Sequence, residues 1–176
     1  MLAFRPPGPR DVDGLAELHV RCWHEAYGGL LTEAELAEHS CASRAAQWQR
    51  ILADPGLFAC VALVDDVPAG FIVSGPARAL ASRFADGEIR AIYVLRAQQR
   101  RGIGGELFRR ACAHWRERGG QSLAILAFAG NAPALAFYRR MGAADAGAAQ
   151  ANPARPELAD MALVWSPAEG AAGAPQ

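Results

Sequence analysis

The sequence contains no lysine, and its four cysteines are widely scattered. Without lysine, the chain cannot form the Gly-x-x-x-x-Gly-Lys-Ser/Thr loop of P-loop nucleotide-binding proteins. The cysteines form no Cys-x-x-Cys pair and stand near no pair of histidines, so the sequence indicates neither a metal site nor a disulfide framework. They are typical of small core or helix residues in a reducing compartment: Cys22, Cys41, Cys60 and Cys112.

Long apolar segments are also missing from the chain. No apolar run reaches the about 18 residues of a membrane-spanning helix, and the N-terminal MLAFRPPGPR has no apolar segment of a signal peptide. A length of 176 residues with 52% hydrophobic residues predicts a single domain over residues 1–165, followed by a disordered Ala/Gly/Pro-rich tail at 166–176. We therefore expect a cytoplasmic protein with no membrane partner.

Charge is balanced overall but unevenly distributed. The net charge is +0, and a pI of about 6.9 gives no support to nucleic-acid binding. Residues 90–118 carry eight arginines against Glu106 and Glu117, which suits a ligand with several phosphates, while seven acidic groups in residues 1–40 suit a cationic amine. Solvated helix faces are the alternative explanation for both clusters.

The clearest functional pattern lies between residues 88 and 105. An alternating strand (89–95) is followed by the turn QRRGIG (99–104) and then by an amphipathic helix. This order presents free backbone N–H groups to a phosphate, and glycine lets the backbone approach closely. Arginines in and before the turn add positive charge. The pattern predicts a phosphorylated ligand, although a glycine turn can also join a strand to a helix without any ligand.

The kind of phosphate site can be narrowed further. A Rossmann fingerprint would need glycine at position 107, where the chain has Leu107, and no acidic residue ends a following strand to hold a ribose. What remains is the pattern Gln/Arg-x-x-Gly-x-Gly/Ala, starting at Gln99.

A second pattern follows downstream. Residues 122–128 (SLAILAF) read as a buried strand. Asn131 is a good N-cap for the next helix, Pro133 fits the first turn, and Gly142 ends the helix.

Together the two patterns resemble the GCN5-related N-acetyltransferase (GNAT) superfamily. The turn at Gln99 is similar to the family's acetyl-CoA motif, and the family's second signature has an asparagine opening the last helix, a Phe-Tyr pair (Phe137-Tyr138) and then Met-Gly (Met141-Gly142). The resemblance covers roughly residues 3–165. It implies an α/β fold of α+β type with a twisted, mostly antiparallel mixed sheet, helices on both faces and a splayed central strand pair.

The expected elements occur in an order that fits this fold. Two of the strands form a hairpin over Asp65-Asp66, Thr32 and Glu35 form a capping box, and segments 75–87 and 148–157 read as connections. We expect strands at 2–5, 57–64, 67–74, 88–95, 122–128 and 159–165, and helices from near Asp11 to Tyr27, after Thr32, and at 43–53, 103–118 and 132–141.

The resemblance also assigns roles to residues around the acetyl-CoA motif. It implies a bulged strand whose exposed backbone at Ile92, Tyr93 and Val94 pairs with pantetheine, with the Val94 N–H as donor to the thioester carbonyl. The turn residues implied to cradle the pyrophosphate are Gln99, Arg100, Arg101, Gly102, Ile103, Gly104 and Gly105, and the second signature adds Asn131, Phe137 and Tyr138 to the cofactor site.

Acetyl transfer to an amine needs a proton donor and a proton acceptor. Tyr138 matches the family's general acid, which protonates the departing thiolate; the alternative is a core tyrosine. Glu88 stands at the offset of a catalytic base in one branch of the family; the alternative is a solvent-exposed residue that opens a strand. Glu25, His24 and a water chain are competing bases.

The acceptor site is less well marked. By resemblance, Trp23, Tyr27, Phe84 and Glu88 are candidate substrate residues, with Leu31 and Trp165 as further possibilities, although the aromatic residues could equally belong to the core. We expect an acetyl-CoA-dependent N-acetyltransferase, monomeric or homodimeric, that uses no metal and acts on a small-molecule primary amine. A protein N-acetyltransferase and a non-catalytic acyl-CoA-binding domain are the alternatives, and the sequence does not identify the amine.

Overall fold

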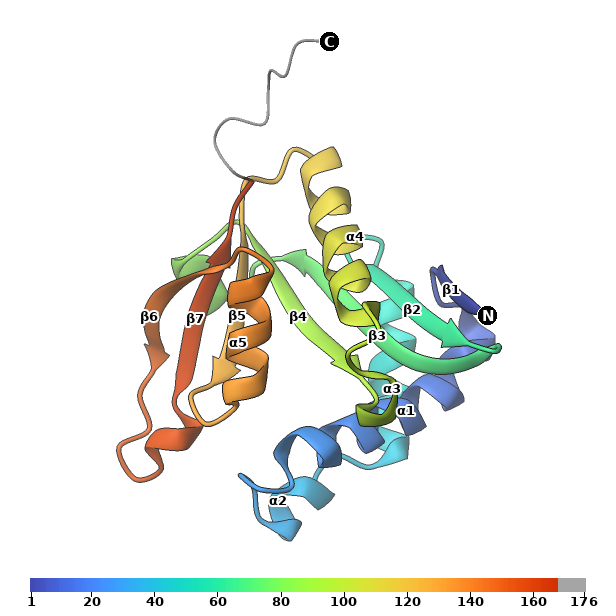
Figure 1. Cartoon of the computed structure of the whole chain (residues 1–176), viewed down its shortest axis with the longest axis horizontal. Helices are drawn as coiled ribbons and strands as arrows, with labels where there is room; N and C mark the ends of the chain where they lie inside the picture. The colour runs from blue at the N-terminus through green and yellow to red at the C-terminus, as the bar shows by residue number, and fades with distance from the viewer. Residues whose placement is uncertain (168–176) are drawn as a thin grey trace.

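The computed structural model describes residues 1–167 and contains one seven-stranded mixed sheet with helices on both faces (Figure 1). The strand order is β1-β2-β3-β4-β5-β7-β6, and β4–β5 is the parallel pair among otherwise antiparallel neighbours. The predicted mixed, mostly antiparallel sheet is confirmed. The strands are β1 (Leu2–Arg5), β2 (Phe58–Val64), β3 (Val67–Pro76), β4 (Gly87–Val94), β5 (Leu123–Phe128), β6 (Ala144–Gln150) and β7 (Asp160–Trp165).

Helices cover the sheet in two layers. In Figure 1, α4 and α5 lie on one face, and α1 and α3 lie on the other. Over residues 1–167, none of these helices combines the length and apolarity needed to span a membrane. The α-helices are α1 (Val12–Tyr27), α2 (Glu33–Ala37), α3 (Cys41–Ala53), α4 (Ile103–Glu117) and α5 (Ala132–Arg140), and short 3-10 turns occupy η1 (Pro9–Asp11), η2 (Ala81–Arg83), η3 (Arg96–Gln98) and η4 (Pro156–Leu158).

Local signals in the sequence explain several of these boundaries. Asp65 and Asp66 both have positive φ (49° and 62°), as the tight turn of a two-residue hairpin requires. The capping box at α2 is present, because Thr32 Oγ1 accepts from the Glu35 N–H and Glu35 accepts from the Thr32 N–H. Helix α3 begins two residues before the predicted start, since Ser40 caps it.

Each face of the sheet has its own hydrophobic core. The α4/α5 face buries Ile72, Ile89, Phe108 and Leu163, whereas the α1/α3 face buries Trp48 and other aromatic and aliphatic side chains. Burying a large apolar side chain contributes about 1.5–3 kcal/mol, so both layers stabilise the sheet that carries the site.

Strands β4 and β5 separate after a short parallel contact. Their register runs from Gly87 opposite Leu123 to Ile89 opposite Ile125, and both strands then continue without pairing to each other. A bulge at Arg90 shifts the β4 register against β3, since Ile89 faces Ser74 while Ala91 faces Val73. Both features were predicted from the resemblance and are present.

Two expectations about connections need correction or remain open. The segment predicted as a loop (148–157) begins inside β6, an edge strand that pairs with β7 through two register shifts. Its residues are small and show no hydrophobic alternation, and Gly147 has a positive φ (98°). Pairing with the β7 backbone, rather than a local sequence signal, therefore forms this strand. Of the predicted tail, residues 168–176 lie outside the described residues.

Candidate active site

The turn before α4 has the backbone expected of an anion cradle. Arg100 and Gly102 adopt positive φ (64° and 81°), and Gly102 is the N-cap of α4. The first intrahelical hydrogen bond runs from the Glu106 N–H to Gly102 O at 3.0 Å. The preceding N–H groups at the helix start have no intrahelical acceptor, and the helix dipole adds a partial positive charge there. This end of α4 is therefore suited to a phosphate.

The Val94 N–H is directed at the gap between β4 and β5. The next residue, Leu95, donates its N–H to Ala69 O on the β3 side at 3.0 Å. Successive N–H groups of a strand point to opposite sides, so the Val94 N–H points away from β3. Gln99 closes the same corner, because its Nε2 donates to Val94 O at 3.1 Å.

The two sequence motifs meet beside this corner. A Cβ placed on Gly104 would lie 3.3 Å from the Phe137 ring and 3.8 Å from Val94 Cγ2, so α4, α5 and β4 converge here. Asn131 caps α5 by accepting from the Ala134 N–H at 3.3 Å, which orients the helix that carries Phe137 and Tyr138.

Three tyrosines from different elements lie around the gap. Tyr138 belongs to the core on the α4/α5 face and is 8% exposed, whereas Tyr93 packs on the α1/α3 face. Burial raises the pKa of Tyr93 well above its usual value, and the nearby Tyr27 and Tyr138 raise it further. Burial, and then Tyr27, also raise the pKa of Tyr138. With their pKa values raised in this way, the hydroxyls of Tyr93 and Tyr138 are protonated at neutral pH.

Glu88 lies at the closed end of the gap, next to the last paired residues of β4 and β5. It is 4% exposed, so the alternative of a solvent-exposed residue is wrong. Arg78 holds its carboxylate with Nε to Oε2 at 2.9 Å, Nη2 to Oε1 at 2.6 Å and the backbone N–H to Oε2 at 3.2 Å. Burial raises the pKa of Glu88, but the hydrogen bonds and charge of Arg78 outweigh it, and the net pKa is lowered.

Glu25 and His24 lie at the C-terminal end of α1. The Glu25 carboxylate accepts from the Arg96 N–H at 2.7 Å, and Arg96 Nη2 donates to Glu25 O at 2.5 Å. Glu25 also forms an ion pair with Arg21 at 3.2 Å. It therefore fastens the β4–α4 turn to α1, while His24 is exposed.

An aromatic cluster borders the open end of the gap. Trp23 and Tyr27 pack at 4.4 Å between ring centroids, and Tyr27 reaches Phe128 at the end of β5 at 5.5 Å. Phe128 was missed from the sequence because a phenylalanine ending a buried strand carries no distinguishing signal. His39 also joins the cluster, 4.5 Å from Trp23.

The structure does not bring all predicted acceptor residues to this cluster. Trp165 pairs with Leu123, at the opposite end of β5 from Phe128, and packs on Phe108. Phe84 directly follows η2 in the chain, shortly before the β4 residues at the closed end of the gap. The guanidinium carbon of Arg83 lies 5.6 Å from the ring centroid of Phe84. Leu31 is in the α1–α2 connection, with its N–H bonded to Tyr27 O.

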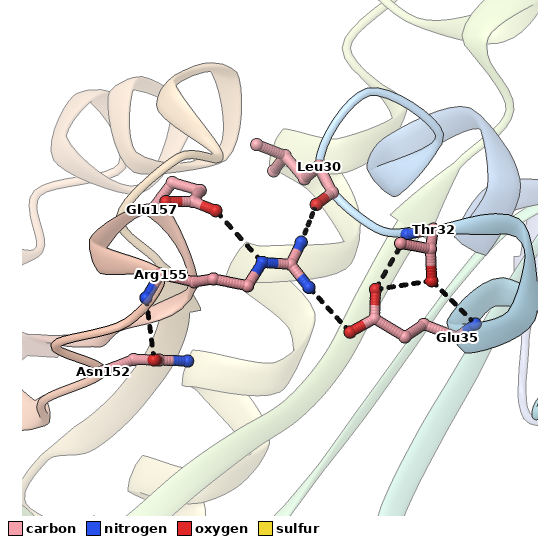
Figure 2. Close-up of polar contacts among 6 residues, drawn as sticks. All are labelled: Leu30, Thr32, Glu35, Asn152, Arg155 and Glu157. Atoms are coloured by element: carbon pink, nitrogen blue, oxygen red, sulfur yellow. Dashed lines mark hydrogen bonds and ion pairs between the residues drawn. The ribbon is translucent and has the colours of Figure 1, made fainter.

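A group of polar contacts around Arg155, called the clasp below, joins the α1–α2 and β6–β7 loops near the open end of the gap (Figure 2). Arg155, in the β6–β7 loop, donates from Nη1 to Glu35 Oε1 at 2.7 Å and from Nη2 to Leu30 O. Its Nε also pairs with Glu157 at 3.2 Å. The Gly130 N–H bonds Glu157 O at 2.8 Å, so the loop before α5 is fastened as well. Nothing in the sequence pattern linked these residues, which are up to 125 positions apart.

Comparison with known proteins identifies this arrangement. Residues 13–143 match the Acetyltransferase (GNAT) family. The chain belongs to the GNAT acetyltransferase family. It is therefore an acetyl-CoA-dependent N-acetyltransferase, as the sequence motifs predicted.

Solved structures share the acetyltransferase fold at low sequence identity. The PaiA N-acetyltransferase of Thermoplasma acidophilum, solved with coenzyme A, is 16% identical, with a TM-score of 0.75 over 95% of this chain and 99% of that chain. For yncA of Salmonella typhimurium, solved with acetyl-CoA, the identity is 18%, with a TM-score of 0.71 over 100% and 98%. A ribosomal-protein-alanine N-acetyltransferase of Brucella melitensis is 20% identical, with a TM-score of 0.70 over 94% and 99%. None of the curated proteins compared matches this sequence.

The described residues fit acetyl-CoA and present no metal cluster. An unpaired β4 edge and a glycine-bearing helix start offer backbone donors for an extended arm and its phosphates. Within residues 1–167, no group of three or more His, Cys, Asp or Glu side chains is placed to hold a metal ion.

Proposed function

We propose that this acetyltransferase acetylates a primary amine of a small molecule by direct attack in a ternary complex. The observation that carries the proposal is the separation of β4 from β5 after Ile89, with the Val94 N–H directed into the gap. Acetyl-CoA supplies an acetyl group on a thiol, which is an activated acyl donor. The unpaired backbone of Ile92, Tyr93 and Val94 would hold its arm, and the turn at 99–105 would hold its phosphates.

Two groups at the gap have the properties needed for the transfer. The Val94 N–H is a preorganised donor for the charge that develops on the carbonyl oxygen during attack. The Tyr138 hydroxyl carries a proton at neutral pH and can donate it to the departing sulfur, although burial raises its pKa and makes it a weaker acid than a free tyrosine. Asn131 and Phe137 serve by positioning α5 against the turn.

For the proton acceptor we propose water rather than Glu88. An efficient general base has a pKa near the working pH. The ion pair with Arg78 lowers the pKa of Glu88 and so moves it further from neutral pH. Glu88 then has a positioning role: it fixes Arg78, in the connection between β3 and η2, against the start of β4.

A small acceptor is favoured over a protein segment by the clasp at Arg155. It connects the α1–α2 and β6–β7 loops beside the aromatic cluster, which limits access for a folded partner. We also propose a single domain over residues 1–165 and a metal-free, monomeric or homodimeric cytoplasmic enzyme; four free cysteines, three of them buried, suit a reducing compartment.

Thermal shift and acetyl-transfer assays test these proposals in order. Acetyl-CoA should raise the melting temperature by mass action, and ATP and NAD should do so far less. Thiol release should then depend on a small amine from a panel. Equal stabilisation by ATP would reduce the turn to a general anion site. Acetylation of peptides but of no small amine would favour the protein-acetyltransferase alternative, and binding without any transfer would favour a non-catalytic acyl-CoA-binding domain.

A further inference from the structure

Arg44 is a buried arginine whose charge has no acidic partner. It lies in the first turn of α3, faces α1, and is 8% exposed, which makes it the only buried arginine among residues 1–167. Arginines elsewhere in this part of the chain, such as Arg5 and Arg155, are more exposed and yet form ion pairs with carboxylates. Buried charges are normally paired, so an unpaired one needs an explanation.

The contacts of Arg44 leave much of its binding capacity unused. Nη1 donates to Gln47 Oε1 at 2.7 Å, while Nε is enclosed and has no hydrogen-bond partner. Nη2 forms no hydrogen bond with a side chain and is not enclosed, so it is accessible. The guanidinium carbon lies 5.3 Å from the Trp23 ring centroid, which offers a cation–π contact but no counter-charge. The first turn of a helix carries a partial positive charge, so α3 favours an anion here as well.

Arg44 also lies beside the proposed acceptor site. Burial lowers its pKa, and Tyr93 offsets part of this effect. Trp23, over which the guanidinium lies, packs against Tyr27 at the open end of the gap. Arg44 thus contacts the aromatic cluster that borders the open end of the gap.

We propose that Arg44 binds the carboxylate of the acceptor, and that the acceptor is therefore a small amino-carboxylate such as a free amino acid. The amine would lie at the gap near Val94, and the carboxylate would pair with Nη2 of Arg44 beside the Trp23 ring. The aromatic rings of Trp23 and Tyr27 would contact the apolar part of the molecule. This inference rests on the proposed transfer of acetyl to a small amine.

The test compares acceptors that differ only in the carboxylate, namely amino acids and the corresponding amino-acid amides. Wild-type enzyme should prefer the acid in kcat/KM by about 10- to 100-fold, the range expected for a hydrogen-bonded charge pair. Arg44→Gln should bring this ratio close to one while retaining activity on the amide, and Arg44→Lys should retain part of the preference. Because each ratio is taken within one variant, a change in folded fraction does not affect it.

Arg50→Gln is the matched control, since Arg50 is on the exposed face of the same helix and its replacement removes an equal charge. It should keep the wild-type ratio. A wild-type enzyme that does not distinguish acid from amide, or an Arg44→Gln enzyme that still prefers the acid, would overturn the assignment of Arg44 while leaving acetyl transfer to amines intact.

A binding measurement covers the case in which no amine is acetylated. With coenzyme A present, N-acetylated amino acids should raise the melting temperature of the wild type more than their amides do, and Arg44→Gln should remove the difference. If this difference is absent from the wild type, the proposal for Arg44 fails. If it is present but no amine is acetylated, the proposed function fails and Arg44 is still an anion-binding residue.

Discussion

Of the groups at the gap, the hydroxyl of Tyr138 can be removed with the least change to the surrounding packing. Tyr138→Phe keeps the ring that packs 5.4 Å from Phe137 and 6.4 Å from Phe108 between centroids, so stability should change little. If the hydroxyl protonates the departing sulfur, kcat should fall about 10²-fold, with the acetyl-CoA dissociation constant nearly unchanged. Steady-state kinetics with a thermal-shift titration of acetyl-CoA separates the two quantities. A fully active variant would mean that water protonates the sulfur.

The ion pair of Glu88 and Arg78 allows the base and positioning roles of Glu88 to be separated. In a positioning role, Glu88→Gln and Arg78→Gln both weaken the same contact, so both should lower kcat/KM by a similar factor at every pH. If Glu88 is the base, the two variants should differ. Glu88→Gln would then lose the acidic limb of the pH–rate profile, and Arg78→Gln would move that limb to higher pH because it frees the carboxylate from its counter-charge. Profiles of kcat/KM for both variants on one accepted amine decide the matter.

At the scale of elements, the start and the end of α4 provide a matched pair of glycines. Gly102 and Gly119 have nearly equal positive φ (81° and 83°), and a Cβ on either would meet nothing within 4 Å. Alanine at either position should cost about 1–2 kcal/mol of backbone strain. Only Gly102→Ala should also raise the KM for acetyl-CoA several-fold, because its methyl group occupies the space next to the N–H groups of the turn. Equal KM values for the two variants would contradict a phosphate site at this turn.

The clasp between loops makes a different prediction. Arg155→Gln removes the ion pair with Glu35, which connects the β6–β7 loop to α2 on the acceptor side of the gap, and the local pair with Glu157 (Figure 2). The KM for the amine should rise several-fold, and the KM for acetyl-CoA should stay the same. Arg139→Gln, which removes the exposed α5–β6 ion pair with Asp145, is the control and should change neither constant. A rise in both constants for Arg155→Gln would point to general loosening instead of a local effect.

Most elements were predictable because their signals are local. Alternation, the Asp65-Asp66 turn, the Thr32 cap and the two motifs indicated six of the strands and all five α-helices. Strand β6 was not predictable, since an edge strand of small residues forms through its partner's backbone. The backbone part of the site followed from the motifs. The partners of Glu88 and the location of Arg44 could not be predicted, because both depend on which elements pack together.

The molecule as a whole should lose stability in mild acid because of His19. This histidine is 3% exposed, lies among the rings of Trp48, Phe71 and Tyr93, and has an Nδ1 without a hydrogen-bond partner. Burial, and then the charge of Arg44, lower its pKa to about 3. An unfolded histidine takes up a proton near pH 6.5, so between about pH 6.5 and 3 the unfolded state binds more protons and stability falls as the pH falls.

This effect of His19 should amount to roughly 2 kcal/mol between pH 6.5 and 5, at about 1.4 kcal/mol per pH unit. The measurement is the free energy of unfolding by guanidinium titration at several pH values. His24→Met should retain the wild-type pH dependence because His24 is exposed. His19→Met, which keeps an apolar side chain of similar size between the rings, should remove most of the slope and leave the smaller contributions of His39 and His114, whose pKa values burial also lowers. An unchanged slope in His19→Met would show that protonation of another group limits stability in this pH range.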